Sequence, residues 1–275
     1  METATNIAVI GDIHGHIPNL ESTITELSNE KDNIDVIVLN GDYSPYNAKS
    51  VEDLAKINYY ALAKVAELKI PTLCIPGSHE PPVFGQIANT IMNQYDNFNA
   101  LLNTNTRYIY KLEDIELELH PGSGVQQDND NPQLVGAFPT NYTFGDLIPG
   151  SKRVLFTHDP PKCETEMGID RSNFTFVEGL ENPVVPVPSN CGHKSIRSKI
   201  FDEDIRVSIN GHIHEAGGRA VDLRNGETLL EQNYKHDRLN LNHGALLNGL
   251  YSVVEVFSEP EEITGAKFEV RKVRY

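Results

Sequence analysis

The stretch "GDIHGH", residues 11–16, directly follows the apolar run Ile7–Ile10. Gly, Asp and His are poor residues for continuing a strand, so the strand is expected to end where they begin. A carboxylate that leaves a buried sheet at such a point needs a hydrogen-bond donor or a cation as its partner. The remainder of the chain supplies candidates for that partner.

Four further segments repeat the arrangement of an apolar run followed by Asp or His. The run 34–39 is followed by "NGD", 72–75 by "PGSHE", 154–156 by "THD" and 205–209 by "NGHIH". Functional groups of open α/β sheets collect at the carboxyl ends of strands, so these side chains are expected to meet at one edge. A single loop histidine is more often solvated than bound to a metal, whereas five such segments in one chain favour a metal site. The candidates are Asp12, His14, Asp42, His79, His158, His212 and His214.

The residue types restrict the metal chemistry. Imidazole and carboxylate without thiolate suit Mn, Fe, Zn, Co or Ni rather than an iron–sulfur cluster. The set is too large for one catalytic zinc, which keeps three protein ligands and an open position. It suits two divalent ions that share one carboxylate. Two ions about 3.5–4 Å apart can hold a bridging hydroxide and stabilise an in-line phosphoryl displacement.

The order of predicted elements indicates one α/β domain over residues 1–275. Apolar residues recur at helical spacing over 18–27, 51–70 and 83–102, between the short strands. Alternating strands and helices favour parallel crossover units. Irregular segments at 121–150 and 159–190 are expected to shape a pocket, and the tail from 228 onward is predicted to form a β-meander.

Charge and cysteine content exclude several classes of function. The net charge is −16, from 39 acidic and 23 basic residues, which disfavours binding to nucleic acid. There is no apolar run of membrane-spanning length and no basic flank at the start, so neither an anchor nor a signal peptide is predicted. Three cysteines without a CxxC pair indicate reduced thiols and a cytoplasmic location. The sequence allows a homodimer and does not decide the oligomeric state.

The ordered set "GDIHG", "NGD", "GSHE", "THD" and "GHIH" resembles the motifs of the calcineurin-like metallophosphoesterases over residues 6–216. The resemblance implies an α/β fold in which two mixed β-sheets pack face to face as a sandwich, flanked by helices. It also implies a role for each candidate. The first metal would be held by Asp12, His14 and His214; Asp42 would bridge; the second metal would be held by His158 and His212; and His79 would be the general acid.

One position departs from the family pattern. The family usually has Asn before the catalytic histidine, bound to the second metal, and here the residue is Ser78. A serine hydroxyl lies closer to the backbone than an amide oxygen, so Ser78 is expected to reach the metal through water at most. The occupancy of the second site, and with it the activity, depends on this residue.

The remaining motifs select a branch of the family. "GDYSPYNAKS" lacks the arginine of the Ser/Thr protein phosphatases, and "HDPP" replaces their "HGG"-type motif. The chain looks more like the small single-domain phosphoesterases related to bacterial cyclic-nucleotide phosphodiesterases. The resulting hypothesis is a phosphodiesterase for a small phosphate ester or nucleotide, with an idle scaffold on the same fold as the alternative. A nuclease is disfavoured because no basic strip is present.

Secondary candidates carry weaker signals. Substrate phosphate contacts are assigned to Lys162, His193, Lys194 and Arg197, each weighed against a solvated loop position. Glu80 and Glu215 are predicted to orient the imidazoles of the neighbouring ligand histidines. Asn210 and His243 either contact a ligand or form turns. Stacking on a nucleobase, against ordinary packing, is considered for Tyr43, Tyr46, Phe138, Tyr142 and Phe144.

Overall fold

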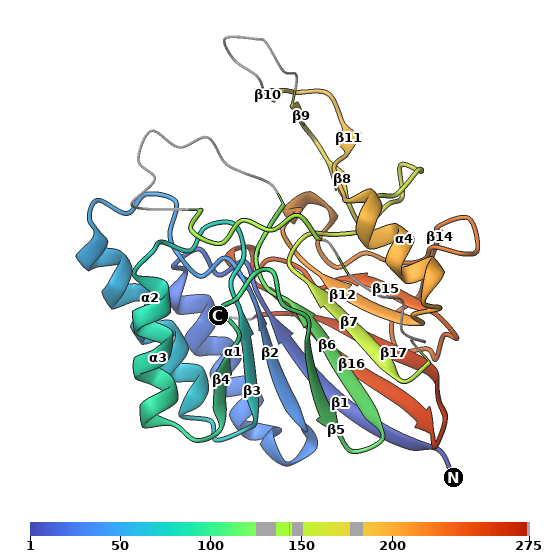
Figure 1. The fold of residues 1–275 in the computed structure, drawn as a ribbon, viewed down its shortest axis with the longest axis horizontal. Coiled ribbons are helices and arrows are strands. Elements are labelled where there is room, and N and C mark those ends of the chain that lie inside the picture. Colours follow the sequence, from blue (N-terminus) through green and yellow to red (C-terminus); the bar gives the residue numbers. More distant parts are fainter. Residues whose placement is uncertain (125–135, 143, 145–150, 177–183, 274–275) are drawn as a thin grey trace.

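The protein is described by a computed structural model that covers residues 1–124, 136–142, 144, 151–176 and 184–273. Two large mixed sheets pack against each other (Figure 1). In spatial order the first contains β17 (Glu262–Lys272), β16 (Leu250–Glu259), β1 (Thr3–Ile10), β2 (Val36–Asn40), β3 (Thr72–Ile75) and β4 (Phe98–Ala100). The second contains β14 (Thr228–Leu229), β13 (Ala220–Asp222), β15 (Leu239–Asn242), β12 (Val207–Asn210), β7 (Arg153–Thr157), β6 (Ile115–His120) and β5 (Tyr108–Leu112).

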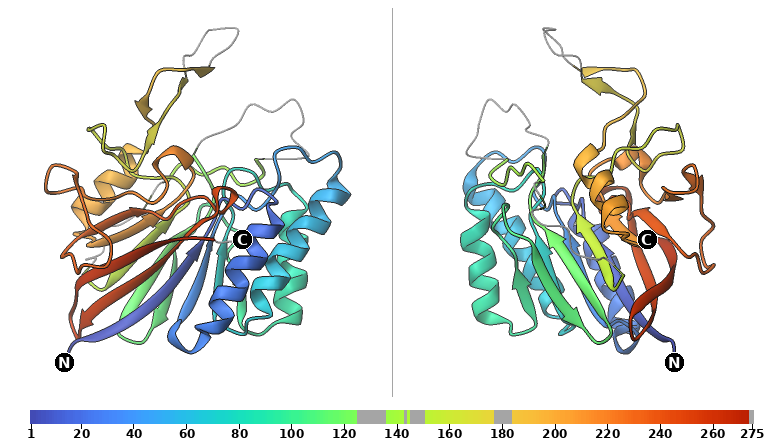
Figure 2. Two further views of the ribbon diagram at one scale, coloured as in Figure 1. Left: turned by 180° about the vertical axis from the view of Figure 1, so that it is seen from behind. Right: turned by 45° about the vertical axis from the view of Figure 1, so that its right-hand side comes forward.

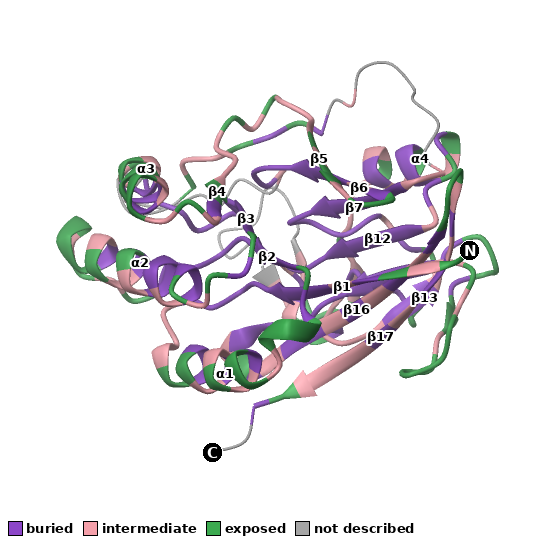
Figure 3. Cartoon of the chain, turned by 90° about the horizontal axis from the view of Figure 1, so that it is seen from below, coloured by how far each residue is buried: buried purple, intermediate pink, exposed green. Residues whose placement is uncertain are grey.

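Side-chain alternation along the strands forms the core between the sheets. Ile7 and Val9 of β1 join a buried cluster that also contains Val154 and Phe156 of β7. The intervening Ala8 belongs to a separate cluster on the outer face of the first sheet. Figure 3 shows both sheets as largely buried, as expected for strands covered on two sides. The predicted sandwich of two mixed sheets is confirmed.

Helices cover both outer faces. The six-stranded sheet carries α1 (Ile17–Asn29), α2 (Val51–Ala66) and α3 (Phe84–Gln94), whereas α4 (Lys194–Asp202) lies on the seven-stranded sheet (Figures 1 and 2). The helix α2 begins at Ser50, whose side chain accepts a hydrogen bond from the Asp53 amide. The side chain of His16 caps α1 in the same way by accepting from the Asn19 amide. No role was predicted for His16 from the sequence.

Parallel pairing brings the motif loops to one end of the sandwich. Strands β1, β2, β3 and β4 run parallel, and so do β6, β7, β12 and β15. The sequence places a motif loop directly after β1, β2, β3, β7 and β12. The carboxyl ends of all five strands therefore deliver Asp or His side chains, as the strand order predicts.

Two predictions about elements are wrong, and one strand was missed. The helix expected over 83–102 ends at Gln94, because Phe98 is buried and β4 pairs with β3. Strand β6 was not predicted, although its sequence "IELELH" alternates apolar and charged residues as a strand does. The tail is not a simple meander, because β15 pairs in parallel with β12.

The two irregular segments are described in part. Residues 125–135, 143, 145–150 and 177–183 lie outside the described residues. The rest of 159–190 contains four two-residue strands in two antiparallel pairs: β8 (Arg171–Ser172), β9 (Thr175–Phe176), β10 (Val184–Val185) and β11 (Ser189–Asn190). In Figure 1 they form an arm above the end of the sheets where the motif loops lie. None of the described helices has the length and apolar character that crossing a membrane requires.

Candidate metal centre

Four of the five motif loops, those after β1, β2, β7 and β12, bring six of the predicted ligands into two triads. Within each triad the ligand atoms lie within 4.8 Å of one another. The first triad contains Asp12, His14 and His214, and the second triad contains Asp42, His158 and His212. A third group, His14, Asp42 and His79, converges within the same distance and overlaps both triads. The two triads are the ligand sets that the family resemblance implies for two metals, and each draws side chains from both sheets.

The carboxylate of Asp42 lies between the triads. Its Oδ2 atom is 3.2 Å from His158 Nε2 and 3.8 Å from His14 Nε2. Its Oδ1 atom accepts hydrogen bonds from the amides of Ser78 at 2.6 Å and His79 at 2.8 Å. The carboxylate is therefore fixed by the backbone of one loop and faces histidines of both triads.

Four residues of the centre have a backbone conformation that non-glycine residues rarely adopt. Asp12, His14, Asp42 and His212 have φ of +48°, +44°, +56° and +67°. Each costs free energy, and such residues persist where the surrounding structure and function require them. The neighbouring Gly41 has φ of +87°, and a Cβ there would lie 2.6 Å from His158 Nδ1. The loops are thus shaped around the side chains that they present.

Hydrogen bonds set the orientation of two imidazoles. His158 Nδ1 donates to the Asn40 carbonyl oxygen at 2.8 Å, and this leaves Nε2 toward Asp42. His14 Nδ1 donates to the Ser44 carbonyl oxygen at 3.3 Å. Histidines that bind metals typically donate their other ring nitrogen in this manner. Imidazole nitrogen and carboxylate oxygen fit the divalent ions named from the sequence.

Electrostatics distinguish the members of the triads. Burial lowers the pKa of His14 to about 4 against the opposing charge of Asp42, so this imidazole is neutral at pH 7. Although burial opposes both effects, Asp42 raises the pKa of His158, and His214 lowers the pKa of Asp12 to about 2. The buried carboxylates therefore stay ionised and favour a cation beside them. A divalent ion could replace a histidine proton there.

A small pocket opens beside the triads. It has a volume of about 250 Å³ and is lined by Asp42, Tyr46, His79, Ser172, His212, Ile213, His214 and Glu215. The Tyr46 ring stacks on His14 with a centroid distance of 4.0 Å, and the His79 ring lies edge-on to both at 4.7 and 4.9 Å. His79 thus sits on the open side of the centre, where a substrate would lie.

Comparison with known proteins agrees with this geometry. The model of the calcineurin-like phosphoesterase family matches residues 5–216. The chain belongs to the calcineurin-like phosphoesterase family. A search of curated proteins found no match.

Solved structures share the fold of this chain. The protein TT1561 of Thermus thermophilus has a TM-score of 0.61 and 15% identity, with 99% of this chain and 100% of that chain covered. A dimetal phosphatase from Danio rerio has a TM-score of 0.54 and 10% identity, with coverage of 98% and 99%. At these identities the likeness concerns the fold.

Several secondary candidates of the phosphoesterase lie elsewhere or act differently. Glu80 was expected to orient an imidazole, but its carboxylate accepts from the amides of Tyr43 at 2.7 Å and Gly77 at 2.6 Å. Arg197 donates to Glu227 at 2.7 Å, and the ammonium of Lys162 donates to a backbone carbonyl. The pocket lining includes Glu215 and Tyr46 but not the four phosphate-contact candidates, Lys162, His193, Lys194 and Arg197.

Sequence reasoning missed Asp159. This buried carboxylate accepts from Ser123 Oγ at 2.7 Å and the Gly124 amide at 2.6 Å, and lies 3.0 Å from His193 Nε2. Its Oδ1 is also 4.0 Å from His212 Nδ1, so it connects a ligand of the second triad to the loop after β6. The sequence feature that could have indicated a role for Asp159 is its position directly after the predicted ligand His158.

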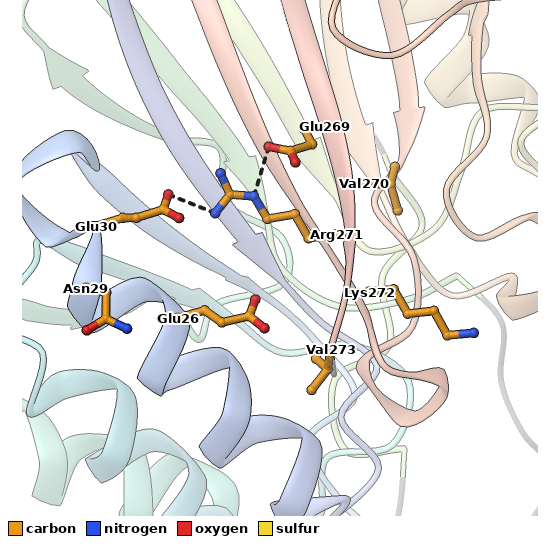
Figure 4. A pocket seen from close by; sticks show the side chains of 8 residues that line it. All are labelled: Glu26, Asn29, Glu30, Glu269, Val270, Arg271, Lys272 and Val273. Carbon is orange, nitrogen blue, oxygen red and sulfur yellow. Dashed lines mark hydrogen bonds and ion pairs between the residues drawn. The ribbon is translucent and has the colours of Figure 1, made fainter. Parts of the chain in front are cut away.

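A larger hollow of about 790 Å³ lies between α1 and β17 (Figure 4). Its Arg271 is already paired with Glu30 and Glu269, each at 2.9 Å. Its other charged side chains include Glu26 and Lys272. No metal-ligand cluster of the described residues lies there.

Proposed function

We propose that this protein is a dinuclear metal-dependent phosphoesterase, acting as a phosphodiesterase on a small phosphate ester or nucleotide. The observation that carries the proposal is the pair of triads, in which Asp42 Oδ2 lies 3.2 Å from His158 Nε2 of its own triad and 3.8 Å from His14 Nε2 of the other. Asp12, His14 and His214 would hold one divalent ion, His158 and His212 the other, and Asp42 would contact both. Mn, Fe, Zn, Co and Ni all suit these ligands.

The protein side chains would hold the metal ions in position and supply the proton for the leaving group. Two bound ions would supply the nucleophile and the positive charge that phosphoryl displacement needs. Asp42 keeps its place through hydrogen bonds from the 78–79 amides. His79, which faces the open side of the centre, protonates the leaving oxygen as general acid. Ser78 Oγ donates to Asp42 Oδ2 at 2.8 Å, so its part is to orient the shared carboxylate.

The pocket favours a diester over a monoester. It has room for a small group, about 250 Å³, and its described lining contains no lysine or arginine. Glu215 and Asp42 add negative charge there. A diester carries one negative charge at pH 7 and a monoester nearly two, so these carboxylates offset more of the attraction between the bound ions and a monoester. The acidic chain, with net charge −16, likewise favours a small substrate over nucleic acid.

Metal content and hydrolysis of bis(p-nitrophenyl) phosphate test this function. The purified protein is expected to bind two equivalents of Mn²⁺ and to release p-nitrophenol. Chelation by EDTA should abolish turnover, and added Mn²⁺ should restore it. Asp12→Asn and His158→Asn should each lose one metal and most activity.

The matched control is His236→Asn, because His236 contacts the Glu231 carbonyl oxygen and is not a member of either triad. This variant should keep the metal content and rate of the natural protein. Turnover that resists chelation would contradict the metal mechanism. Absence of bound metal in the natural protein would favour the alternative, a scaffold on a phosphoesterase fold.

A further inference from the structure

A buried histidine outside both triads lies behind Asp12. His243 follows β15 and has no exposed surface. Its amide donates to the Asn210 carbonyl oxygen at 2.8 Å, and its own carbonyl oxygen accepts from Ser252 Oγ at 2.8 Å. The backbone of His243 is therefore tied to β12 on one side and to β16 on the other.

The loop with the Asp–x–His motif and the loop with the His–x–His motif both leave room for this ring. A Cβ on Gly11 would lie 2.6 Å from His243 Cε1, and a Cβ on Gly211 would lie 2.5 Å from His243 Nε2. Real Cβ atoms do not approach so closely. The two glycines that precede Asp12 and His212 thus leave a slot that the imidazole fills.

The imidazole faces a metal ligand with an unused nitrogen. Neither ring nitrogen of His243 has a hydrogen-bond partner among the described residues, and Nε2 is the one that lies 3.9 Å from Asp12 Oδ2. A buried polar nitrogen without a partner is costly, so its position calls for an explanation. The other oxygen, Asp12 Oδ1, lies 3.4 Å from His214 Nε2 within the first triad. The carboxylate is therefore placed between a predicted ligand and His243.

We propose that His243 is a positioning residue for the first metal, which donates its Nε2–H to Asp12 Oδ2. The gap of 3.9 Å is about 1 Å longer than a hydrogen bond, and a small rotation of the carboxylate closes it. Oδ1 is then held toward His14 and His214. Hydrogen bonds to ligating carboxylates tune affinity in this way. The inference rests on the proposed function, since it requires that Asp12 binds a metal.

His243 is not assigned as a ligand itself. The groups of side chains whose ligand atoms converge within 4.8 Å in the described structure do not include it. Its contacts are with Gly11, Gly211 and the outer side of Asp12. Its effect on the metal must therefore pass through the carboxylate.

The test is a calorimetric Mn²⁺ titration of the metal-free protein and of two variants. His243→Phe keeps a ring in the slot and removes the N–H donor, whereas His243→Gln keeps an N–H donor. The Phe variant should bind Mn²⁺ at the first site about 10–100-fold more weakly, while the second site changes less than about 3-fold. The Gln variant should recover most of the affinity. His243→Asn, too short to reach Asp12, replaces the Phe variant if circular dichroism shows that the latter is unfolded.

The outcomes separate this inference from the proposed function. If the natural protein binds no Mn²⁺, the proposed function fails. If it binds two equivalents and the Phe variant binds both with unchanged affinity, the role of His243 is overturned while the function stands. Equal weakening of both sites would also overturn it, because a general loss of packing would then explain the change.

Discussion

At the scale of single residues, Ser78 distinguishes this chain from the family pattern. Its hydroxyl donates to Asp42 Oδ2 at 2.8 Å, and its amide donates to Oδ1 at 2.6 Å. Ser78 therefore donates hydrogen bonds to the Asp42 carboxylate from both its backbone and its side chain. The position that an asparagine amide would take toward the second metal is left to water or to substrate.

Replacing Ser78 with Asn should therefore strengthen the second site. An amide oxygen reaches about one bond further than a hydroxyl and can contact the ion directly. The Mn²⁺ affinity of the second site should rise about 10-fold, the lower end of the range for supporting contacts. Calorimetric titration measures it, and Ser78→Ala, which removes the hydroxyl, should weaken the same site. Equal affinities in all three proteins would show that this side chain does not affect the metal.

The role of His79 predicts a dependence on the leaving group. A general acid contributes about 10²–10⁴-fold where the departing oxygen needs a proton, and much less for a stable phenolate. His79→Gln should therefore reduce the kcat of an alkyl diester far more than that of bis(p-nitrophenyl) phosphate. Metal content by elemental analysis should stay at the natural value. An equal reduction for both substrates would exclude proton donation by this residue.

At the scale of elements, the location of the site was predictable because parallel strands end at the same edge. Asp12 and Asp42 come directly after β1 and β2, so their meeting required no knowledge of the loops. The sequence analysis did not predict β6, which carries Glu118. In the folded protein Glu118 is buried beside Arg153 and Lys199, a pairing across β6, β7 and α4 that the local sequence does not encode.

That buried charge cluster predicts how stability responds to acid. Burial alone would raise the pKa of Glu118, but hydrogen bonds from His120 and Lys199 lower it to about 2. Because the folded pKa is below the unfolded one, the contribution is complete above about pH 4.5 and is lost between pH 4.5 and 2. Glu118→Gln should be less stable at pH 7, and its deficit should shrink by about 2 kcal/mol as the pH falls through that window.

Urea unfolding from pH 7 to pH 2.5 measures the difference. The control is Glu52→Gln, since Glu52 forms an exposed ion pair with Lys56 at 2.8 Å. Such pairs contribute little, so this variant should follow the natural protein at every pH. A constant deficit for Glu118→Gln across the window would contradict the assignment.

At the scale of the whole molecule, the centre joins the two sheets. In the first triad Asp12 and His14 follow β1 of the six-stranded sheet, and His214 follows β12 of the seven-stranded sheet. In the second triad Asp42 follows β2, whereas His158 and His212 come from the other sheet. An ion held by either triad would therefore contact both halves of the sandwich and would bring positive charge among buried carboxylates.

Metal binding should consequently stabilise the entire fold. An ion that binds the native state at 100 times its Kd adds about 2.7 kcal/mol per site. For a chain of this size that corresponds to a rise in Tm of at least about 5 °C. Differential scanning calorimetry should show this rise when Mn²⁺ is added to EDTA-treated protein. The double variant Asp12→Asn/His158→Asn breaks both triads, so its Tm should not respond to Mn²⁺. If the natural protein also shows no response, the ions do not link the sheets, whatever their effect on turnover.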